Sequence, residues 1–272
     1  MMSPPVNRRF ILPVLLTVCL SGITSPARAF DYTGYAGVLR KYVHNGLVDY
    51  KRLKQNRSGL DSFIESAARL SKKELQGWPR SGQLAFYLNA YNAITLQRII
   101  DHYPPVSHQG TPEISIRNIE GVWDKIKNNV AGESVTLNDL EHNIIRKRFK
   151  EPRIHFALVC AARGCPVLIP ERYYGDRLET QLTRAAKLFL ADKKKNYIDF
   201  SRKIIFLSPL FDWYGNDFVE KYGGKASGPH GKKLGAILSF CSQYVSPREA
   251  AFIRDQSYQV KFSSYDWSLN SL

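Results

Sequence analysis

The sequence contains few of the residues and patterns on which several protein classes depend. Only four of its 272 residues are cysteine, and no internal repeat or low-complexity tract occurs. Beyond residue 20 there is no run of about 18 apolar residues, so we expect no membrane-spanning helix there. No RNA- or DNA-binding motif is present, and no spacing of cysteine and histidine matches a standard zinc site. These absences predict a protein without a bound metal, a cofactor or a nucleic-acid partner.

Acidic residues are also scarce, because 24 Asp and Glu stand against 39 Lys and Arg, a net charge of +15. Such an excess favours anionic surroundings such as lipid head groups, cell-wall polymers or acidic substrates. The basic residues are scattered except in the runs 146–148 and 193–195, which we interpret as solvated faces. The expected partner is an anionic envelope component or a peptide-like substrate.

The N-terminus has the pattern of a cleavable signal peptide. Arg8 and Arg9 precede an apolar run over residues 10–20, and residues 27–29 read Ala-Arg-Ala, an A-x-A cleavage site. We therefore expect an exported protein, periplasmic or secreted, that begins at Phe30. Three cysteines then remain, and an odd number in an oxidising compartment leaves at least one thiol without an intramolecular partner.

Hydrophobic periodicity predicts a helix-rich α+β protein of one domain. Helical spacing occurs over 32–45, 60–70, 81–102, 136–149, 176–191 and 234–245. A small mixed or antiparallel sheet is expected from 153–160, the hairpin 197–207 and the segment 259–263. The chain is expected to comprise a signal peptide at 1–29, an N-terminal helical segment at 30–82, a core at 83–218, and C-terminal helices with a closing strand of the same domain at 219–272.

Reactive side chains are concentrated in one stretch, residues 153–166. Its apolar first half contains His155 and predicts a strand covered on both faces. Cys160 and Cys165 follow around a turn. In an unbroken strand Cys160 and His155 point to opposite faces, so Cys165 is the better candidate for a nucleophile with His155 as its base.

Three alternatives to a thiol nucleophile stay open for this stretch. Cys160 and Cys165 can form a structural disulfide in an exported protein. They can join His155 in a metal site of no standard spacing, or act as a redox pair without the usual C-x-x-C spacing. His155 itself can be a core histidine whose nitrogens are satisfied by neighbouring groups.

Two buried amides and one carboxylate complete the set of candidate site residues. Asn89 and Asn92 lie three residues apart on the predicted helix 81–102, which is apolar almost all round. Either they bind neighbouring backbone, or one of them orients a histidine or a substrate. Glu141 lies on an apolar stripe of the helix 136–149, where a pairing with Arg148 or with a histidine is expected.

Six motifs in this order resemble domain-of-unknown-function family 547, which occurs in exported bacterial proteins and in some plant proteins. They are residues 85–92 (Ala-Phe-Tyr-Leu-Asn-Ala-Tyr-Asn), 140–142 (Leu-Glu-His), 155–160 (His-Phe-Ala-Leu-Val-Cys), 164–166 (Gly-Cys-Pro), 213–218 and 265–270. The resemblance covers about residues 45–270, with a core between Gln83 and Phe218. The resemblance implies that these segments are the functionally important parts of the chain, but it does not imply any particular activity.

The candidate residues favour a cysteine-dependent hydrolase or acyl transferase acting on an amide-containing envelope substrate. Its catalytic residues are expected to be Cys165 and His155 with Asn89, Asn92 or Glu141 as the orienting group. A helix packed near a strand histidine is also seen in papain-like and transglutaminase-like folds, although this chain has asparagine where those enzymes have cysteine. The alternative is a non-catalytic envelope binding or scaffolding domain with a Cys160–Cys165 disulfide.

Overall fold

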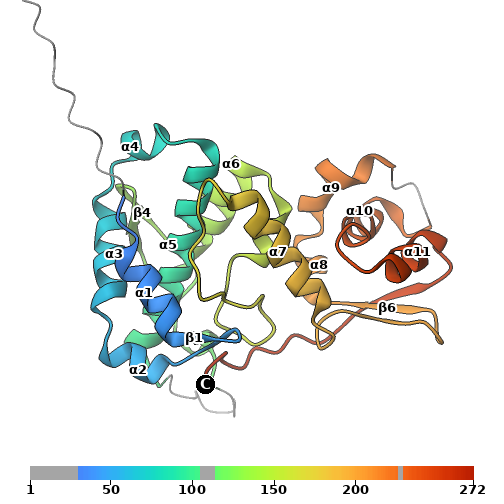
Figure 1. The fold of residues 1–272 in the computed structure, drawn as a ribbon, viewed down its shortest axis with the longest axis horizontal. Helices are drawn as coiled ribbons and strands as arrows, with labels where there is room; N and C mark the ends of the chain where they lie inside the picture. The colour runs from blue at the N-terminus through green and yellow to red at the C-terminus, as the bar shows by residue number, and fades with distance from the viewer. Residues whose placement is uncertain (1–29, 105–113, 226–228) are drawn as a thin grey trace, which may run out of the picture. The chain divides into compact units, whose positions relative to one another are not determined.

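The helix at the centre of the fold is α5 (Arg80–Asp101), which a computed structural model places among the other N-terminal helices (Figure 1). The structure describes residues 30–104, 114–225 and 229–272, so the predicted signal peptide lies outside the described residues. Fifteen residues of α5 are buried, as expected from an apolar sequence without a polar face. The helix ends shortly before the proline pair 104–105, which cannot continue a helix.

The other helices surround α5 or follow it in the chain. Those before it are α1 (Thr33–Tyr42), α2 (Tyr50–Gln55), α3 (Ser58–Arg69) and α4 (Lys72–Gln76). Those after it are α6 (Lys147–Phe149), α7 (Leu178–Ala191), α8 (Pro209–Tyr214), α9 (Asn216–Tyr222), α10 (Gly231–Cys241) and α11 (Pro247–Asp255). Short 3-10 helices are η1 (Ile116–Asn118), η3 (Pro152–Phe156) and η4 (Gly223–Lys225), and η2 (Asp139–Arg146) is a π-helix.

The strands form three small sheets. Antiparallel pairs join β1 (Val43–His44) to β2 (Leu47–Val48) and β3 (Asn128–Val130) to β4 (Glu133–Val135). The third sheet has the order β5 (Tyr197–Asp199), β6 (Ile204–Leu207) and β7 (Gln259–Phe262), with β5 antiparallel and β7 parallel to β6. Residues 31–272 form one compact unit, which confirms the prediction of a helix-rich α+β domain.

The prediction of a strand over 153–160 is wrong. Residues 152–156 form η3, in which Pro152 occupies the first turn and the Glu151 carboxylate accepts the Arg153 N–H. The chain then continues without regular structure to Cys160. An apolar run without periodicity does not distinguish a strand from other buried segments. The sheet in this region therefore contains only the hairpin and the C-terminal strand that were expected beside it.

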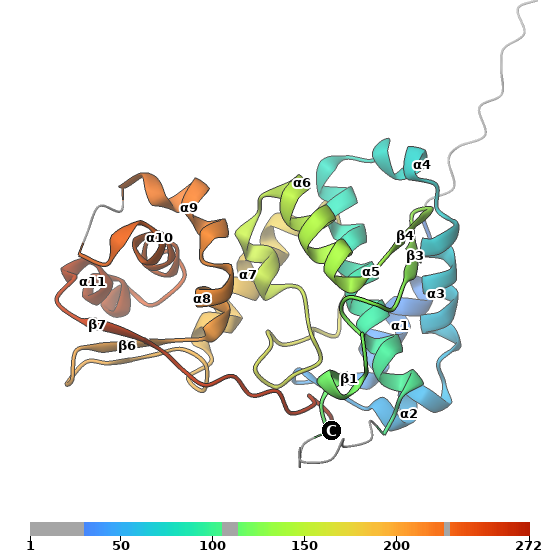
Figure 2. The ribbon, with the colours of Figure 1, turned by 180° about the vertical axis from the view of Figure 1, so that it is seen from behind.

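After β7 the chain runs back to the N-terminal helices, as both views show (Figures 1 and 2). Leu272 N–H donates to the Val48 carbonyl at 3.0 Å, and Ala162 and Leu269 form an isolated antiparallel bridge. This path carries Tyr265 past the cysteine turn. Within the described residues, no helix has both the length and the apolar character needed to cross a membrane.

Candidate functional site

His155 is held rigidly at the centre of the candidate site. Its side chain is only 2% exposed, and its Nε2 lies 2.7 Å from Oδ2 of Asp217. The ring stacks on Tyr214 of α8 with centroids 4.0 Å apart. The next residue, Phe156, packs in an aromatic core against Phe189 and Phe240 and anchors the short η3 helix. These contacts orient the imidazole so that Nε2 faces the carboxylate.

Asp217, in the first turn of α9, is itself fixed by a second group. Arg146 donates from Nε and Nη2 to the two carboxylate oxygens of Asp217 at 2.7 and 2.8 Å. Burial alone raises the pKa of Asp217, but the hydrogen bonds and charges of His155 and Arg146 outweigh burial and hold the pKa well below its ordinary value. Asp217 is therefore ionised at neutral pH, and its carboxylate accepts a hydrogen bond from the ring of His155.

The lowered pKa of Asp217 predicts a pH dependence of stability. A carboxylate with a lower pKa in the folded state stabilises that state above its unfolded pKa of about 4 and loses the effect as pH falls through the folded value. The difference in free energy of unfolding between the wild type and Asp217→Asn should be constant above about pH 5 and shrink below about pH 4. Urea titrations at several pH values measure this difference in free energy. A difference that does not change with pH contradicts an ionised Asp217 with a lowered pKa.

A small pocket of about 40 Å³ brings several predicted site residues together. Its lining includes Glu141 of η2 and three residues of the stretch 153–166, His155, Cys160 and Cys165. The prediction that Cys160 turns away from His155 is wrong, because it assumed a continuous strand. The segment is irregular after η3, and Ala161 has a left-handed φ of 59° that reverses the chain direction.

The two cysteines of the turn are paired in the structure. Cys160 and Cys165 form a disulfide with Cα atoms 6.1 Å apart. Two hydrogen bonds also converge on the sulfur of Cys165, from the Cys160 N–H at 3.0 Å and from the Tyr265 hydroxyl at 3.2 Å. Burial raises the pKa of Tyr265, which keeps its hydroxyl protonated and able to donate. Both donors therefore lie within hydrogen-bonding distance of the Cys165 sulfur.

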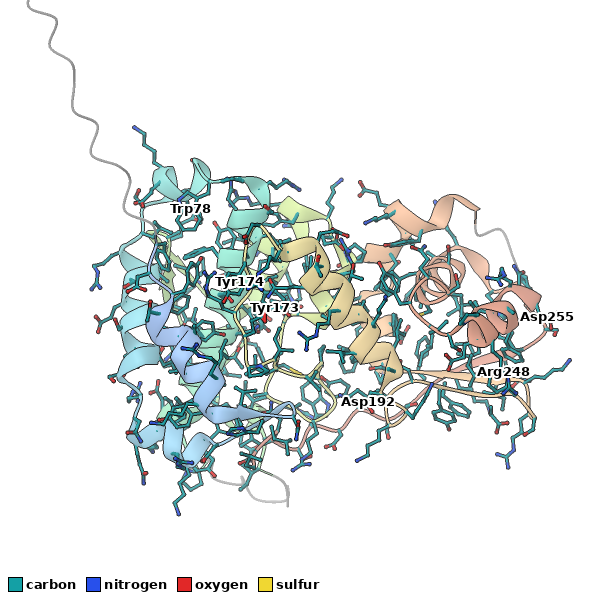
Figure 3. All side chains as sticks on the ribbon, viewed as in Figure 1. Trp78, Tyr173, Tyr174, Asp192, Arg248 and Asp255 are labelled. Carbon is teal, nitrogen blue, oxygen red and sulfur yellow. A yellow bond between two sulfur atoms is a disulfide. The ribbon has the colours of Figure 1, made fainter. Side chains whose placement is uncertain are left out.

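Cys165 separates the small pocket from a much larger cavity. The larger cavity has a volume of about 430 Å³ and is lined by Gly164, Cys165, Pro166, Tyr265 and residues of the chain that follows α7. Cys165 and Pro166 are the residues that line both spaces, whereas His155 and Cys160 line only the small one. Asp192, labelled in Figure 3, lies on the wall of the large cavity at the end of α7. A molecule in that cavity can therefore contact Cys165, whereas Cys160 is not part of the cavity wall.

Asn89 and Asn92 are engaged with backbone rather than with the pocket. Asn89 donates to the Tyr173 carbonyl and accepts the Tyr173 N–H at 2.8 and 2.9 Å, and Tyr173 lies close to α5 (Figure 3). Asn92 donates to the Ala157 carbonyl and accepts the Val159 N–H, both at 2.9 Å. Asn92 thus satisfies two backbone groups of the segment that lacks a neighbouring strand. The group that bonds the His155 ring is Asp217.

Replacing Asn92 with alanine should destabilise the fold. The change leaves the Ala157 carbonyl and the Val159 N–H buried without partners, at about 1–3 kcal/mol for each group. We expect the free energy of unfolding to fall by about 2–4 kcal/mol in urea titrations. Asn143→Ala is the matched control, since Asn143 is an exposed asparagine whose amide bonds the Asp139 side chain. Equal losses in the two variants contradict a structural role for Asn92.

Glu141 lies on the wall of the small pocket at 8% exposure. It accepts a hydrogen bond from Tyr91 of α5 at 3.0 Å, and its other oxygen is 3.8 Å from Nδ1 of His142. Burial and the Glu141 carboxylate raise the pKa of Tyr91, so this phenol stays a neutral donor. Of the two pairings expected for Glu141, the one with a histidine is therefore present, in His142, whereas Arg148 donates to Tyr87 and Gln83 instead.

Three residues of the site were not assigned from the sequence. Arg146 belongs to the basic run 146–148, which the sequence suggested was a solvated face, yet Arg146 and Arg148 are both held by internal hydrogen bonds. Asp217 lies in the motif 213–218. Tyr265 was noted only within a C-terminal motif. Each of these residues lies in one of the motifs or near one, but nothing in the sequence indicated which residue it would bond to.

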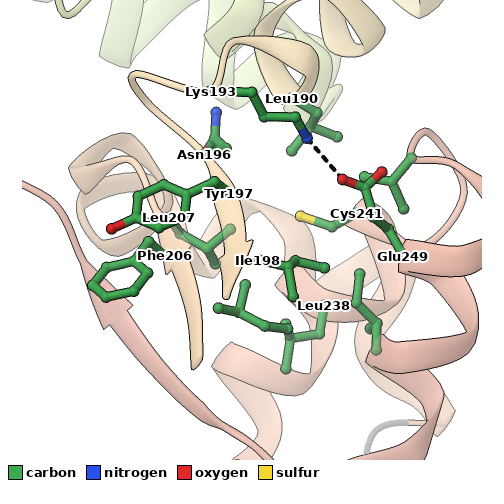
Figure 4. Close-up of a pocket in the computed structure, with 13 residues that line it drawn as sticks. Leu190, Lys193, Asn196, Tyr197, Ile198, Phe206, Leu207, Leu238, Cys241 and Glu249 are labelled. Atoms are coloured by element: carbon green, nitrogen blue, oxygen red, sulfur yellow. Dashed lines mark hydrogen bonds and ion pairs between the residues drawn. The ribbon is translucent and has the colours of Figure 1, made fainter. Parts of the chain in front are cut away.

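The third cysteine of the described residues lies outside the site. Cys241, in α10, lines a narrow apolar pocket of about 20 Å³ (Figure 4). Lys193 and Glu249 form an ion pair at 2.7 Å beside this pocket. Burial raises the pKa of the Cys241 thiol far above its ordinary value, so it is not a nucleophile at neutral pH. Among the described residues, no group of three His, Cys, Asp or Glu is arranged to hold a metal ion.

Cys165, whose sulfur is in the disulfide, lines the same small pocket as His155, and Asp217 bonds the histidine ring. Asp217 engages Nε2 of His155, and among the residues that the structure describes no hydrogen bond occupies Nδ1. Nucleophilic catalysis by a thiol uses a histidine base that a third group orients. The pairing of Cys160 with Cys165 keeps that thiol oxidised in the structure.

Comparisons with known proteins identify one family. No match was found among curated proteins or among solved structures, so a likeness to papain or transglutaminase stays a prediction. Residues 75–190 match the family described as "Protein of unknown function, DUF547". This region includes α5, η3, both cysteines of the turn and α7, and excludes Asp217 and Tyr265. The match supports the assignment of this part of the chain to the DUF547 family.

Proposed function

We propose that this protein is a cysteine-dependent hydrolase or acyl transferase that acts on an amide-containing substrate of the cell envelope. The nucleophile is Cys165, the general base is His155, and Asp217 orients the imidazole. Arg146 is a positioning residue, because it holds Asp217 and does not line the small pocket. The observation that carries the proposal is that Cys165 lines both the 430 Å³ cavity and the pocket of His155.

The reaction follows from these positions. The free Nδ1 of His155 takes the proton of the Cys165 thiol, and the thiolate attacks the carbonyl carbon of the amide. The Tyr265 hydroxyl, which lies 3.2 Å from the Cys165 sulfur, can donate to the oxyanion that forms beside it. The carbon–nitrogen bond then breaks, the amine leaves with the proton from His155, and an acyl thioester remains. Water or a second amine releases the acyl group and restores the thiol.

The disulfide gives this proposal a redox requirement. A thiol reductant must attack the Cys160–Cys165 bond and leave both cysteines as thiols, while the reductant is oxidised to its own disulfide. Export through a signal peptide at residues 1–29 belongs to the same proposal, since an envelope substrate requires it.

The alternative is a non-catalytic envelope domain that binds or scaffolds, and the paired cysteines favour it. Peptide mass analysis without reductant, followed by iodoacetamide labelling after mild reduction, separates the two functions. The catalytic proposal predicts that Cys165 of the folded, reduced protein is labelled rapidly at neutral pH and that Cys165→Ala removes this labelling. A disulfide that resists mild reduction, or a reduced Cys165 that stays unlabelled, supports the scaffolding function instead.

A further inference from the structure

The large cavity beside Cys165 has cationic side chains on its wall that the proposed chemistry does not use. Arg163, Lys194 and Lys195 line it, together with Asp192 and Asp266. Lys195 is neutralised by Asp192, since their charged atoms lie 3.0 Å apart. Asp266 accepts hydrogen bonds from the backbone and hydroxyl of Ser268. Asp192 is therefore paired with a cation, whereas Asp266 is bonded by neutral groups, and the three cations and two carboxylates leave the wall with a formal net charge of 3 − 2 = +1.

Two of the three cations, by contrast, form no ion pair with a carboxylate of the described residues. Within residues 30–104, 114–225 and 229–272, the ammonium group of Lys194 makes no hydrogen bond or ion pair, and only its backbone N–H is bonded, to Asp192. Arg163 donates from one guanidinium nitrogen to the Ser271 carbonyl at 3.2 Å and pairs with no carboxylate of the described chain. Arg163 also lies two residues before Cys165, on the same turn.

We infer that the cavity binds a substrate that carries a carboxylate, held by Lys194 and Arg163 next to the carbonyl that Cys165 attacks. This inference rests on the proposed function, because it names the class of substrate for the same thiol. Because the cations of the wall outnumber its carboxylates, an anion near Lys194 and Arg163 is attracted and its local concentration rises. A carboxylate-bearing peptide or acylated amino acid has both the anion and the amide that the site requires.

Two alkylating reagents of matched size test the inference without requiring hydrolysis. Iodoacetate carries a carboxylate and iodoacetamide is neutral, and peptide mass analysis gives the alkylation rate of each at Cys165 after reduction. We divide the rate with iodoacetate by the rate with iodoacetamide. At low salt this ratio should be about fivefold higher for Cys165 than for a neutral reference thiol, N-acetylcysteine amide, and it should decline as salt is added. Lys194→Gln combined with Arg163→Gln should bring the ratio to the reference value, whereas the exposed Lys187→Gln, outside the cavity, should leave it unchanged.

A second readout uses the unreduced protein and needs no free thiol. Trp213 and Trp267 both contact Tyr265 on the cavity wall, with centroid distances of 4.9 and 4.6 Å. Titration with succinate should change their fluorescence saturably in the wild type and not in the double variant. Inorganic phosphate at equal ionic strength should be weaker. Stronger binding of phosphate, an unchanged iodoacetate ratio in the double variant, or absence of saturable succinate binding overturns the inference. An unreactive Cys165 with normal succinate binding refutes only the proposed catalysis.

Discussion

Replacement of Asp217 by asparagine is expected to lower the rate of thiol-dependent ester hydrolysis by a factor of about 10² to 10⁴. The carboxylate accepts a hydrogen bond from Nε2 of His155 at 2.7 Å and thereby leaves Nδ1 free to take the thiol proton. An amide at this position can donate to Nε2 through its nitrogen and so favour the other ring tautomer. Hydrolysis of p-nitrophenyl acetate by the reduced protein measures the rate.

Asp212→Asn is the matched control for this change. Asp212 is a second aspartate of the same aromatic segment, five residues before Asp217, but its side chain is 53% exposed and pairs with Lys233. Its replacement should leave the rate unchanged. If both variants hydrolyse the ester as fast as the wild type, Asp217 does not orient His155 for catalysis.

Replacement of Arg153 by methionine is expected to reduce the free energy of unfolding by about 3 kcal/mol. The Arg153 side chain is 4% exposed and donates to both oxygens of Glu151 at 2.7 and 2.8 Å, and also to Glu179 of α7. Burial by itself lowers the pKa of Arg153, but its bonds to the two glutamates outweigh burial and raise it. Removing the cation leaves Glu151, 15% exposed, with the backbone N–H of residue 153 and, as its cationic partner among the described residues, Lys221 at 3.7 Å.

A matched control for this substitution is Arg202→Met. Arg202 is 77% exposed, and its Nε lies 3.8 Å from Asp199, so its loss should cost less than about 0.5 kcal/mol. Guanidinium titrations of both variants give the two values. A loss below about 1 kcal/mol in Arg153→Met contradicts a structural role of the Arg153 ion pairs in fixing η3 to α7.

Local sequence patterns predicted most of the helices but not the course of residues 153–160. The helix α5 was predictable because it is long, apolar and closed by two prolines, features that depend only on neighbouring residues. The apolar run from Ile154 to Val159 was ambiguous, since burial permits a strand or an irregular segment alike. Its conformation depends on Asn92, about 65 residues earlier in the chain, whose amide replaces the hydrogen bonds of a neighbouring strand.

Several residues of the candidate site could be predicted from the sequence, but the residues that they contact could not. His155, Cys165 and Glu141 were identified from the sequence, and they line one pocket. The partners of His155 could not be found, because Asp217 follows it by 62 residues and Tyr214 stacks on it from another helix. The left-handed φ of Ala161, between two cysteines that line that pocket, was not predictable either, because alanine rarely adopts this conformation.

The most direct measurement uses the Cys160→Ala variant without any reductant, because this change removes the disulfide and leaves Cys165 as a free thiol. Brief reaction with p-nitrophenyl acetate, followed by intact and peptide mass analysis, detects an acetyl thioester. The variant should form this adduct on Cys165, and the further change His155→Ala should slow its formation by a factor of about 10² or more. An unmodified Cys165 in Cys160→Ala, or equal rates with and without His155, contradicts a histidine-activated cysteine nucleophile.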